Sequence, residues 1–178
     1  VGSFLNYQEK LYASGSFVYG MNNTTLRKYN TSDCNLVASI ALPSECRCIF
    51  GNSAGTKLYC VSTTGVMYRI DVASFTRDTS VAYNLSMASS NTLSLAKNGN
   101  IMYLFSESGS GTAIAQTFVK FNMDDDSRTI YSPSTSNGLS LNTHNAMNID
   151  TANNRLIFFR VNRGSIAQTN CEIINIPD

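Results

Sequence analysis

The sequence contains no tryptophan, one histidine and three prolines, and only 14% of its 178 residues are charged. Its formal net charge is +1 and no run of like charges occurs, which argues against a nucleic-acid partner because such proteins need a clustered basic surface. No apolar run approaches the ~20 residues of a membrane-spanning helix. A single histidine leaves few side chains for acid–base catalysis. We therefore expect no nucleic-acid partner, no membrane span, no cofactor, no metal and no catalytic residues.

The residues that are abundant predict a folded domain with a neutral polar surface. Hydrophobic residues make up 43% of the chain, which is enough for a packed core at this length. The 20 asparagines and 39 serines and threonines must supply much of the surface, because charged residues are few. Such an exterior is commoner in secreted and cell-surface proteins, so we expect this protein to be secreted or to lie at the cell surface.

The dominant pattern of the chain is a repeat of short β-strands. The clearest unit, residues 57–85, contains expected strands at 58–62, 66–71 and 79–85, which are apolar, β-prone and separated by turns. Its middle strand recurs in three other units, and every copy ends in a large apolar residue followed by Asn or Asp. An Asx side chain can accept a hydrogen bond from the backbone two residues on, so each ending predicts a tight turn. These endings are Asn30, Asp71, Asn122 and Asn175.

A further short apolar segment precedes the first strand of each unit and completes a four-stranded antiparallel sheet. These segments are 4–7, 48–50, 93–96 and 146–149. Four strands in about 45 residues is the size of one propeller blade. Continuous apolar runs such as Ile101 to Phe105 support stacked blades, since strands buried on both faces lose their in-out alternation. We therefore predict a single all-β domain over 1–178, a β-propeller with almost no helix and blades at about 4–42, 46–85, 92–132 and 145–178.

One stretch of the chain is similar to a known propeller repeat. In LYCVSTTGVMYRIDVAS, a strand beginning Leu-Tyr is followed by a turn and by a strand ending in Ile-Asp. This order resembles the YVTN-type β-propeller repeat, which is related to quinoprotein amine dehydrogenase propellers. The resemblance covers nearly the whole chain, is strongest at 36–72, and implies blades without implying any catalytic residue. Segments 106–117 and 160–169 depart from the repeat as expected insertions.

The fourth unit is predicted to be incomplete, because its third strand, 171–175, is followed by only three residues. Open sheet edges recruit foreign strands, and propeller rings usually close by pairing their two ends. We therefore expect the open ends to contact further protein, either additional propeller blades or a second chain.

The five cysteines include one pair with an informative spacing. If the strands around residue 54 form a symmetric hairpin, Cys48 and Cys60 lie directly opposite each other, within disulfide reach. The alternative is a pair of buried free thiols, and Cys46 competes as a partner because it shares the face of Cys48. The sequence does not indicate which partner Cys34 or Cys171 would have.

Four N-glycosylation sequons are present, which is about the number that chance gives in so Asn-, Ser- and Thr-rich a chain. Asn84, on a predicted outer strand, is the easiest to modify if the protein is secreted. The candidate sites are Asn22, Asn23, Asn30 and Asn84.

Three features suggest chemistry but have simpler interpretations. The only histidine, His144, lies in an Asn-rich linker, where a solvated residue is commoner than a general base. The acidic run from Asp124 to Asp126 lacks the later ligands of a calcium loop and is interpreted as a solvated turn. The Gly-spaced stretch 106–111 lacks the lysine and helix of a phosphate-binding loop.

Binding is better supported than catalysis. Long polar segments are predicted to gather on one face of the propeller, at 16–23, 106–117, 132–145 and 160–169. Aromatic planes beside Asn, Arg and Glu suit a sugar or an exposed peptide, although these segments could equally be tolerated insertions. The candidate ligand-binding residues are Phe17, Tyr19, Glu107, His144, Arg160 and Arg163.

The sequence thus favours an extracellular or cell-surface recognition module that binds a glycan or protein partner through its loop-rich face. One alternative is a structural propeller repeat in a multi-chain assembly. Another is a non-catalytic part of a propeller oxidoreductase or lyase, whose catalytic groups would come from other blades.

Overall fold

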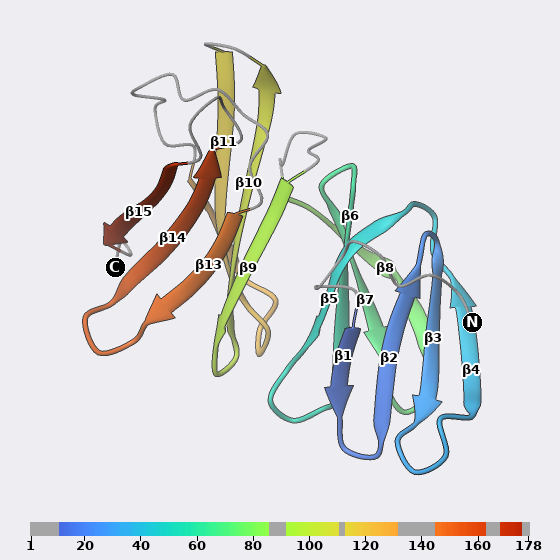
Figure 1. Cartoon of the computed structure of the whole chain (residues 1–178). Helices are drawn as coiled ribbons and strands as arrows, with labels where there is room; N and C mark the ends of the chain where they lie inside the picture. The colour runs from blue at the N-terminus through green and yellow to red at the C-terminus, as the bar shows by residue number, and fades with distance from the viewer. Residues whose placement is uncertain (1–10, 86–91, 111–112, 132–144, 163–167, 176–178) are drawn as a thin grey trace. The chain divides into compact units, whose positions relative to one another are not determined.

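The structure is a computed structural model that describes residues 11–85, 92–110, 113–131, 145–162 and 168–175 (Figure 1). These residues form strands β1 to β15 connected by turns, and they contain no helix. None of them therefore belongs to a helix that could cross a membrane. The chain divides into two compact units, Val1–Leu85 and Ser86–Asp178, which are described separately.

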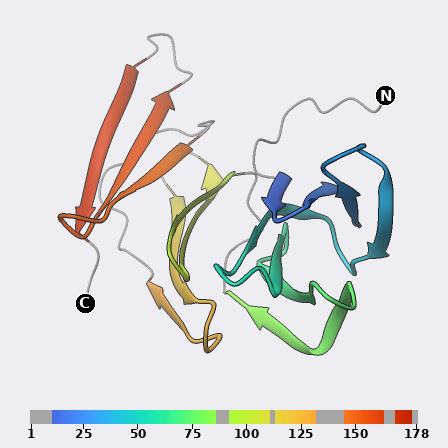
Figure 2. The same ribbon diagram turned by 90° about the horizontal axis from the view of Figure 1, so that it is seen from below.

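The first unit contains two four-stranded antiparallel sheets with their strands in sequence order. In each sheet the chain runs back and forth between neighbouring strands, and the first strands of the two sheets, β1 and β5, contact each other (Figure 2). The first sheet comprises β1 (Leu11–Ser14), β2 (Phe17–Asn22), β3 (Thr25–Asn30) and β4 (Leu36–Ala41). The second comprises β5 (Cys46–Gly51), β6 (Lys57–Ser62), β7 (Val66–Asp71) and β8 (Thr76–Asn84).

The second unit has one four-stranded and one three-stranded antiparallel sheet among its described residues. The four-stranded sheet comprises β9 (Thr92–Asn98), β10 (Ile101–Ser110), β11 (Ala113–Asn122) and β12 (Arg128–Tyr131). The three-stranded sheet comprises β13 (Asn145–Asp150), β14 (Arg155–Asn162) and β15 (Gln168–Asn175). Again the first strands, β9 and β13, contact each other. The predicted all-β class with four-stranded antiparallel blades is confirmed, and three strands of the last blade are described.

The first sheet contains its strands in different places from those predicted. The first strand was expected at 4–7, but β1 is the first described strand of the sheet, and β2 lies within the segment 16–23 that was expected to be a loop. The predicted strand 4–7 lies outside the described residues. Residues 17–22 form a strand because Phe17, Tyr19 and Met21 alternate with their neighbours, which places three apolar side chains on one face of β2.

The expected insertion at 106–117 is a continuation of the β10–β11 hairpin. The two strands pair from Ile101 opposite Asn122 to Ser110 opposite Ala113. Serine, glycine and alanine have low strand propensity, so the local sequence favours a loop here. Backbone pairing between β10 and β11 nevertheless extends the two strands through this segment. Among the described residues the hairpin extends beyond its neighbours, because β9 pairs with β10 only as far as Glu107.

Three of the four Asx turns predicted at the ends of the third strands are present, and the residues that follow Asn175 lie outside the described residues. Asn30 Oδ1 accepts a hydrogen bond from Ser32 N at 3.2 Å, and Asn122 Oδ1 accepts one from Asp124 N at 3.0 Å. In the second sheet, Asp71 Oδ1 accepts from Ser74 N at 2.8 Å, one residue further along. The Ser74 hydroxyl also donates to Asp71 Oδ1 at 2.8 Å. The two hydrogen bonds from Ser74 lower the pKa of Asp71. Each strand end therefore fixes its own turn locally.

The core of the first unit lies between its two sheets, with fully buried Leu26, Leu58 and Ile70 at its centre. In the second unit, Tyr103 and Phe118 stack with ring centroids 6.0 Å apart, and Ile149 packs against their cluster from the neighbouring sheet. Both cores are thus formed by adjacent blades, because each sheet buries its apolar face against the next.

Candidate functional site

The predicted ligand-binding residues of the first unit lie on a strand, not on a loop. Phe17 and Tyr19 are both on β2, where Phe17 is half-buried and Tyr19 is fully buried. Their placement in a solvent-facing loop was therefore wrong. Both side chains point into the unit, so they pack in its core and do not form a binding surface.

Two of the other predicted residues also lie on strands. Glu107 belongs to β10 and Arg160 to β14, and each is paired with neighbouring strands on both sides. His144 and Arg163 lie outside the described residues. The structure therefore leaves the proposed ligand-binding role of this set as a prediction.

Lys28 is the centre of an aromatic cluster inside the first unit. Its Nζ lies 4.0 Å from the ring centroid of Phe17 and 5.7 Å from that of Phe75, and it donates to Val72 O at 3.5 Å. The side chain is only 9% exposed and forms no ion pair with a described residue. Cation–π attraction and one long hydrogen bond thus hold this ammonium group between the two sheets.

Tyr19 lies beside Lys28 in this cluster, since the two residues are directly opposite each other on β2 and β3. Its ring is 6.2 Å from Phe75 and 6.5 Å from Tyr12 between centroids. Its buried hydroxyl has no hydrogen-bond partner among the described residues, and burial raises its pKa. The cluster is closed to solvent, so it stiffens the contact between blades and does not offer an open binding site.

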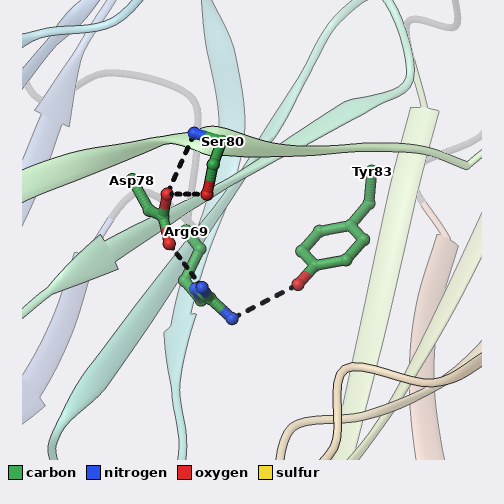
Figure 3. A network of polar contacts seen from close by, with 4 residues as sticks. All are labelled: Arg69, Asp78, Ser80 and Tyr83. Atoms are coloured by element: carbon green, nitrogen blue, oxygen red, sulfur yellow. Dashed lines mark hydrogen bonds and ion pairs between the residues drawn. The ribbon is translucent and has the colours of Figure 1, made fainter.

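A second polar cluster is partly open to solvent and lies on strands β7 and β8 (Figure 3). Arg69 forms an ion pair with Asp78 through Nη2 and Oδ2, and its Nη1 lies 3.5 Å from the Tyr83 hydroxyl. Asp78 Oδ1 accepts hydrogen bonds from Ser80 N at 3.0 Å and from Ser80 Oγ at 2.6 Å. We call Arg69, Asp78, Ser80 and Tyr83 the arginine network.

The backbone places the arginine network by means of a β-bulge. The β7–β8 register shifts between Tyr68 and Ile70, so that Arg69 lies opposite the extra residues of β8. The side chains of Arg69 and Asp78 are 22% and 30% exposed. The sequence did not indicate this site, because the bulge in the β7–β8 pairing is what places Arg69 opposite Asp78 and Ser80. A basic residue near a strand end and the polar run 76–80 were the only local signals.

The chemistry of the arginine network suits binding better than proton transfer. Hydrogen bonds from Ser80, followed by those from Arg69, lower the pKa of Asp78 from 3.8 to about 2. Asp78 therefore stays a carboxylate at neutral pH and cannot act as a general acid there. A guanidinium, a carboxylate and a phenol in fixed positions offer donors and acceptors to a polar ligand.

The predicted disulfide between Cys48 and Cys60 is absent. The ladder pairs Cys48 with Val61 and Cys60 with Ile49, so the predicted register was wrong by one residue. Neighbouring strand residues face opposite sides of a sheet, which directs the two thiols apart. The cause is the hairpin turn, which pairs Gly51 with Leu58 and so centres the hairpin between residues 54 and 55 and not on residue 54.

The three cysteines of this hairpin are buried free thiols, as in the alternative prediction. Cys46 Sγ donates to Ser44 O at 3.5 Å. Burial, reinforced by the nearby Cys46, raises the pKa of Cys60 well above its usual value. These thiols therefore act as small core residues.

The acidic run of the second unit forms a turn, as predicted. Asp124 Oδ1 accepts from Asn100 Nδ2 at 2.6 Å, and Asp125 Oδ1 accepts from Ser127 N at 2.9 Å. Of the sequon asparagines, Asn22, Asn23 and Asn84 are exposed, whereas Asn30 is half-buried and uses its side-chain oxygen in its turn.

No protein-family model and no curated protein matches the chain. Among solved structures, the chain is similar to hydrazine synthase from Kuenenia stuttgartiensis, with a TM-score of 0.65 and 10% identity over 92% of this chain and 49% of that one. It is also similar to the WD40 repeats of RRP9, with a TM-score of 0.61 and 9% identity over 96% of this chain and 52% of that one. Apo AztD from Citrobacter koseri gives a TM-score of 0.51 and 14% identity over 65% and 31%.

The chain has a β-propeller fold. It spans about half, or less, of the chains that it resembles. At these identities the similarity establishes the fold alone, and the YVTN-type repeat stays a prediction. Several unrelated functions share propeller folds, so function must be argued from this chain's own side chains.

Proposed function

We propose that the chain is a propeller recognition module, secreted or at the cell surface, that binds a protein or glycan partner. The observation that carries this proposal is the partly exposed arginine network on β7 and β8. Its groups are held by one another and by a regular sheet, so that a ligand meets donors and acceptors already in place. Such preorganisation lowers the entropy lost on binding.

The network fits ligands rich in hydroxyl or amide groups. Asp78 can accept hydrogen bonds from such groups, while Arg69 and Tyr83 can donate to their oxygen atoms. Arginine and tyrosine are also the residue types most often found at the energetic centres of interfaces. A protein or glycan surface meets these requirements.

A specific observation favours a second candidate, a structural role in a larger propeller assembly. In the described part of the chain, β15 has β14 as its only partner. Its outer edge could pair with a strand from further blades or from a second chain, as the sequence predicts. This role is compatible with ligand binding at the arginine network, because the two features lie in different units.

A binding screen with matched variants tests the main proposal. We would apply the labelled 178-residue chain to glycan and peptide arrays, together with Arg69→Gln, Asp78→Asn and the control Arg27→Gln. Arg27 is a half-buried arginine at the corresponding strand of the first sheet and lies outside the network. We expect the two network variants to lose the ligands that the parent and control retain. Equal binding by all four proteins, or no binding by the parent, would overturn the proposal.

A further inference from the structure

Strand β4 is an outer strand without charged residues. Its sequence is Leu-Val-Ala-Ser-Ile-Ala, and Leu36 and Val37 are 56% and 52% exposed. The outer strands of the next two sheets carry charges, namely Arg77 and Asp78 on β8 and Arg128 on β12. Charged residues on an edge strand oppose pairing with other chains, and β4 lacks this protection.

The hydrogen-bond pattern identifies which backbone groups of β4 face outward. Leu42 N donates to Thr24 O at 2.7 Å, which makes that pair a hydrogen-bonded one. Bonded and non-bonded pairs alternate in an antiparallel ladder, so Ala38 and Ile40 also bond to β3. Ser39 and Ala41 therefore direct their N–H and C=O groups away from the sheet, to an edge where β4 has no further strand partner among the described residues.

We infer that this edge pairs with β4 of a second copy of the chain, antiparallel and across a two-fold axis at Ser39. Outward-facing residues must oppose outward-facing residues, so Ser39 meets Ser39 of the second copy. This register joins the two Ser39 residues by backbone hydrogen bonds and brings the exposed Val37 of each copy near Ala41 of the other.

The chemistry of β4 favours a copy of itself over a charged partner strand. A two-fold axis places each side chain near its own mate, so any charge close to the axis would face a like charge. No residue between Leu36 and Ala41 carries a charge. The β3–β4 ladder passes from Lys28 opposite Ala38 to Tyr29 opposite Leu36, so Val37 is the bulged residue, and the pairing is centred two residues beyond it. Because the interface is self-complementary, it closes at a dimer and does not propagate into fibres.

Charge substitutions at the axis test this inference. Ser39 is exposed, so Ser39→Lys and Ser39→Glu leave the packing of the blade unchanged. Each places like charges opposite each other, and we expect the dimer dissociation constant to rise by about fivefold or more. The effect should be larger for lysine, because Arg27 lies opposite Ser39 on β3 and adds to the positive charge. An equimolar mixture of the two variants should restore dimers.

The measurements are sedimentation velocity and hydrogen exchange on the 178-residue chain. Thr79→Lys, an exposed position on the outer strand β8, is the matched control and should dimerise like the parent. In the parent, the amides of Ser39 and Ala41 should become protected as concentration rises, while those of Ala38 and Ile40 stay protected throughout.

Three results would overturn the inference. The first is a parent chain that stays monomeric across micromolar concentrations. The second is a dimer that is insensitive to both Ser39 charges. The third is a mixture of the lysine and glutamate variants that associates no better than either alone.

Discussion

The ring of Tyr12 rests on the backbone of Gly51, and a Cβ placed at Gly51 would lie 2.7 Å from Cε1 of that ring. The two residues belong to β1 and β5, the strands through which the sheets of the first unit contact each other. The absence of a side chain at Gly51 therefore sets the distance between these two blades.

Substituting Gly51 should destabilise the first unit. Gly51→Ala introduces a methyl group where the ring already lies, and we expect unfolding to become easier by about 1 to 3 kcal/mol. Urea unfolding measures this change. The double variant Tyr12→Leu with Gly51→Ala should recover part of the loss, and strictly additive losses would contradict the contact.

Lys28 should tolerate an apolar replacement of similar length. Its ammonium group has one hydrogen bond of 3.5 Å, two aromatic neighbours and no ion pair with a described residue. Because the cost of burying the charge offsets the cation–π attraction, Lys28→Met should change stability by less than about 1 kcal/mol. Lys28→Ala should cost about 2 to 3 kcal/mol through lost packing. Equal losses in urea unfolding would show that the charge, and not the packing, stabilises the cluster.

Asp78 should make stability depend on pH in the acid range. Its pKa in the folded chain is about 2, below the usual 3.8, so the folded state binds a proton less readily than the unfolded state. The resulting stabilisation is present above pH 3.8 and is lost as pH falls towards 2.

The test is to measure urea unfolding of the parent and of Asp78→Asn between these two pH values. The variant should show a flatter dependence, although Asp71 and Asp150, whose pKa values are also lowered, will leave some slope in both proteins. Parallel curves would mean that the arginine network does not hold the charge of Asp78 in solution.

Cys34 should react with thiol reagents well before the cysteines of the second sheet. Cys34 is exposed, whereas Cys46, Cys48 and Cys60 are buried, and the pKa of Cys60 is raised. Thiolates are the reactive form, so burial protects Cys60 both by excluding the reagent and by raising its pKa, and it excludes the reagent from Cys46 and Cys48. Timed alkylation followed by peptide mapping should label Cys34 first, and Cys34→Ser should remove that early label. Rapid labelling of Cys60 would contradict the packing of the second sheet.

The parts of the fold that the sequence predicted are those with local causes. Asn30 and Asn122 bind backbone groups two residues away, and no other part of the chain is needed for such a turn. The recurrence of these endings indicated the number of blades for the same reason.

The errors arose where distant strands decide the structure. The register of Cys48 depends on how the turn pairs Gly51 with Leu58, and a shift of one residue moves a side chain to the other face. Arg69 and Asp78 meet across a bulge, which the spacing of residues along the chain does not determine. Phe17 and Tyr19 show the alternation of a strand, but their polar neighbours concealed it.

Because the β10–β11 hairpin is long, its resistance to local unfolding should fall from its base towards its tip. Near its base the hairpin has β9 on one side and β12 on the other, but beyond Glu107 and Phe118 the described residues provide no further neighbour. A two-stranded ribbon is only marginally stable by itself, so amides from Ser108 outward should exchange by local fraying while those near Leu104 wait for the sheet to unfold. A protease that needs an unpaired segment would therefore cut the ribbon near its tip first and leave the rest of the blade folded.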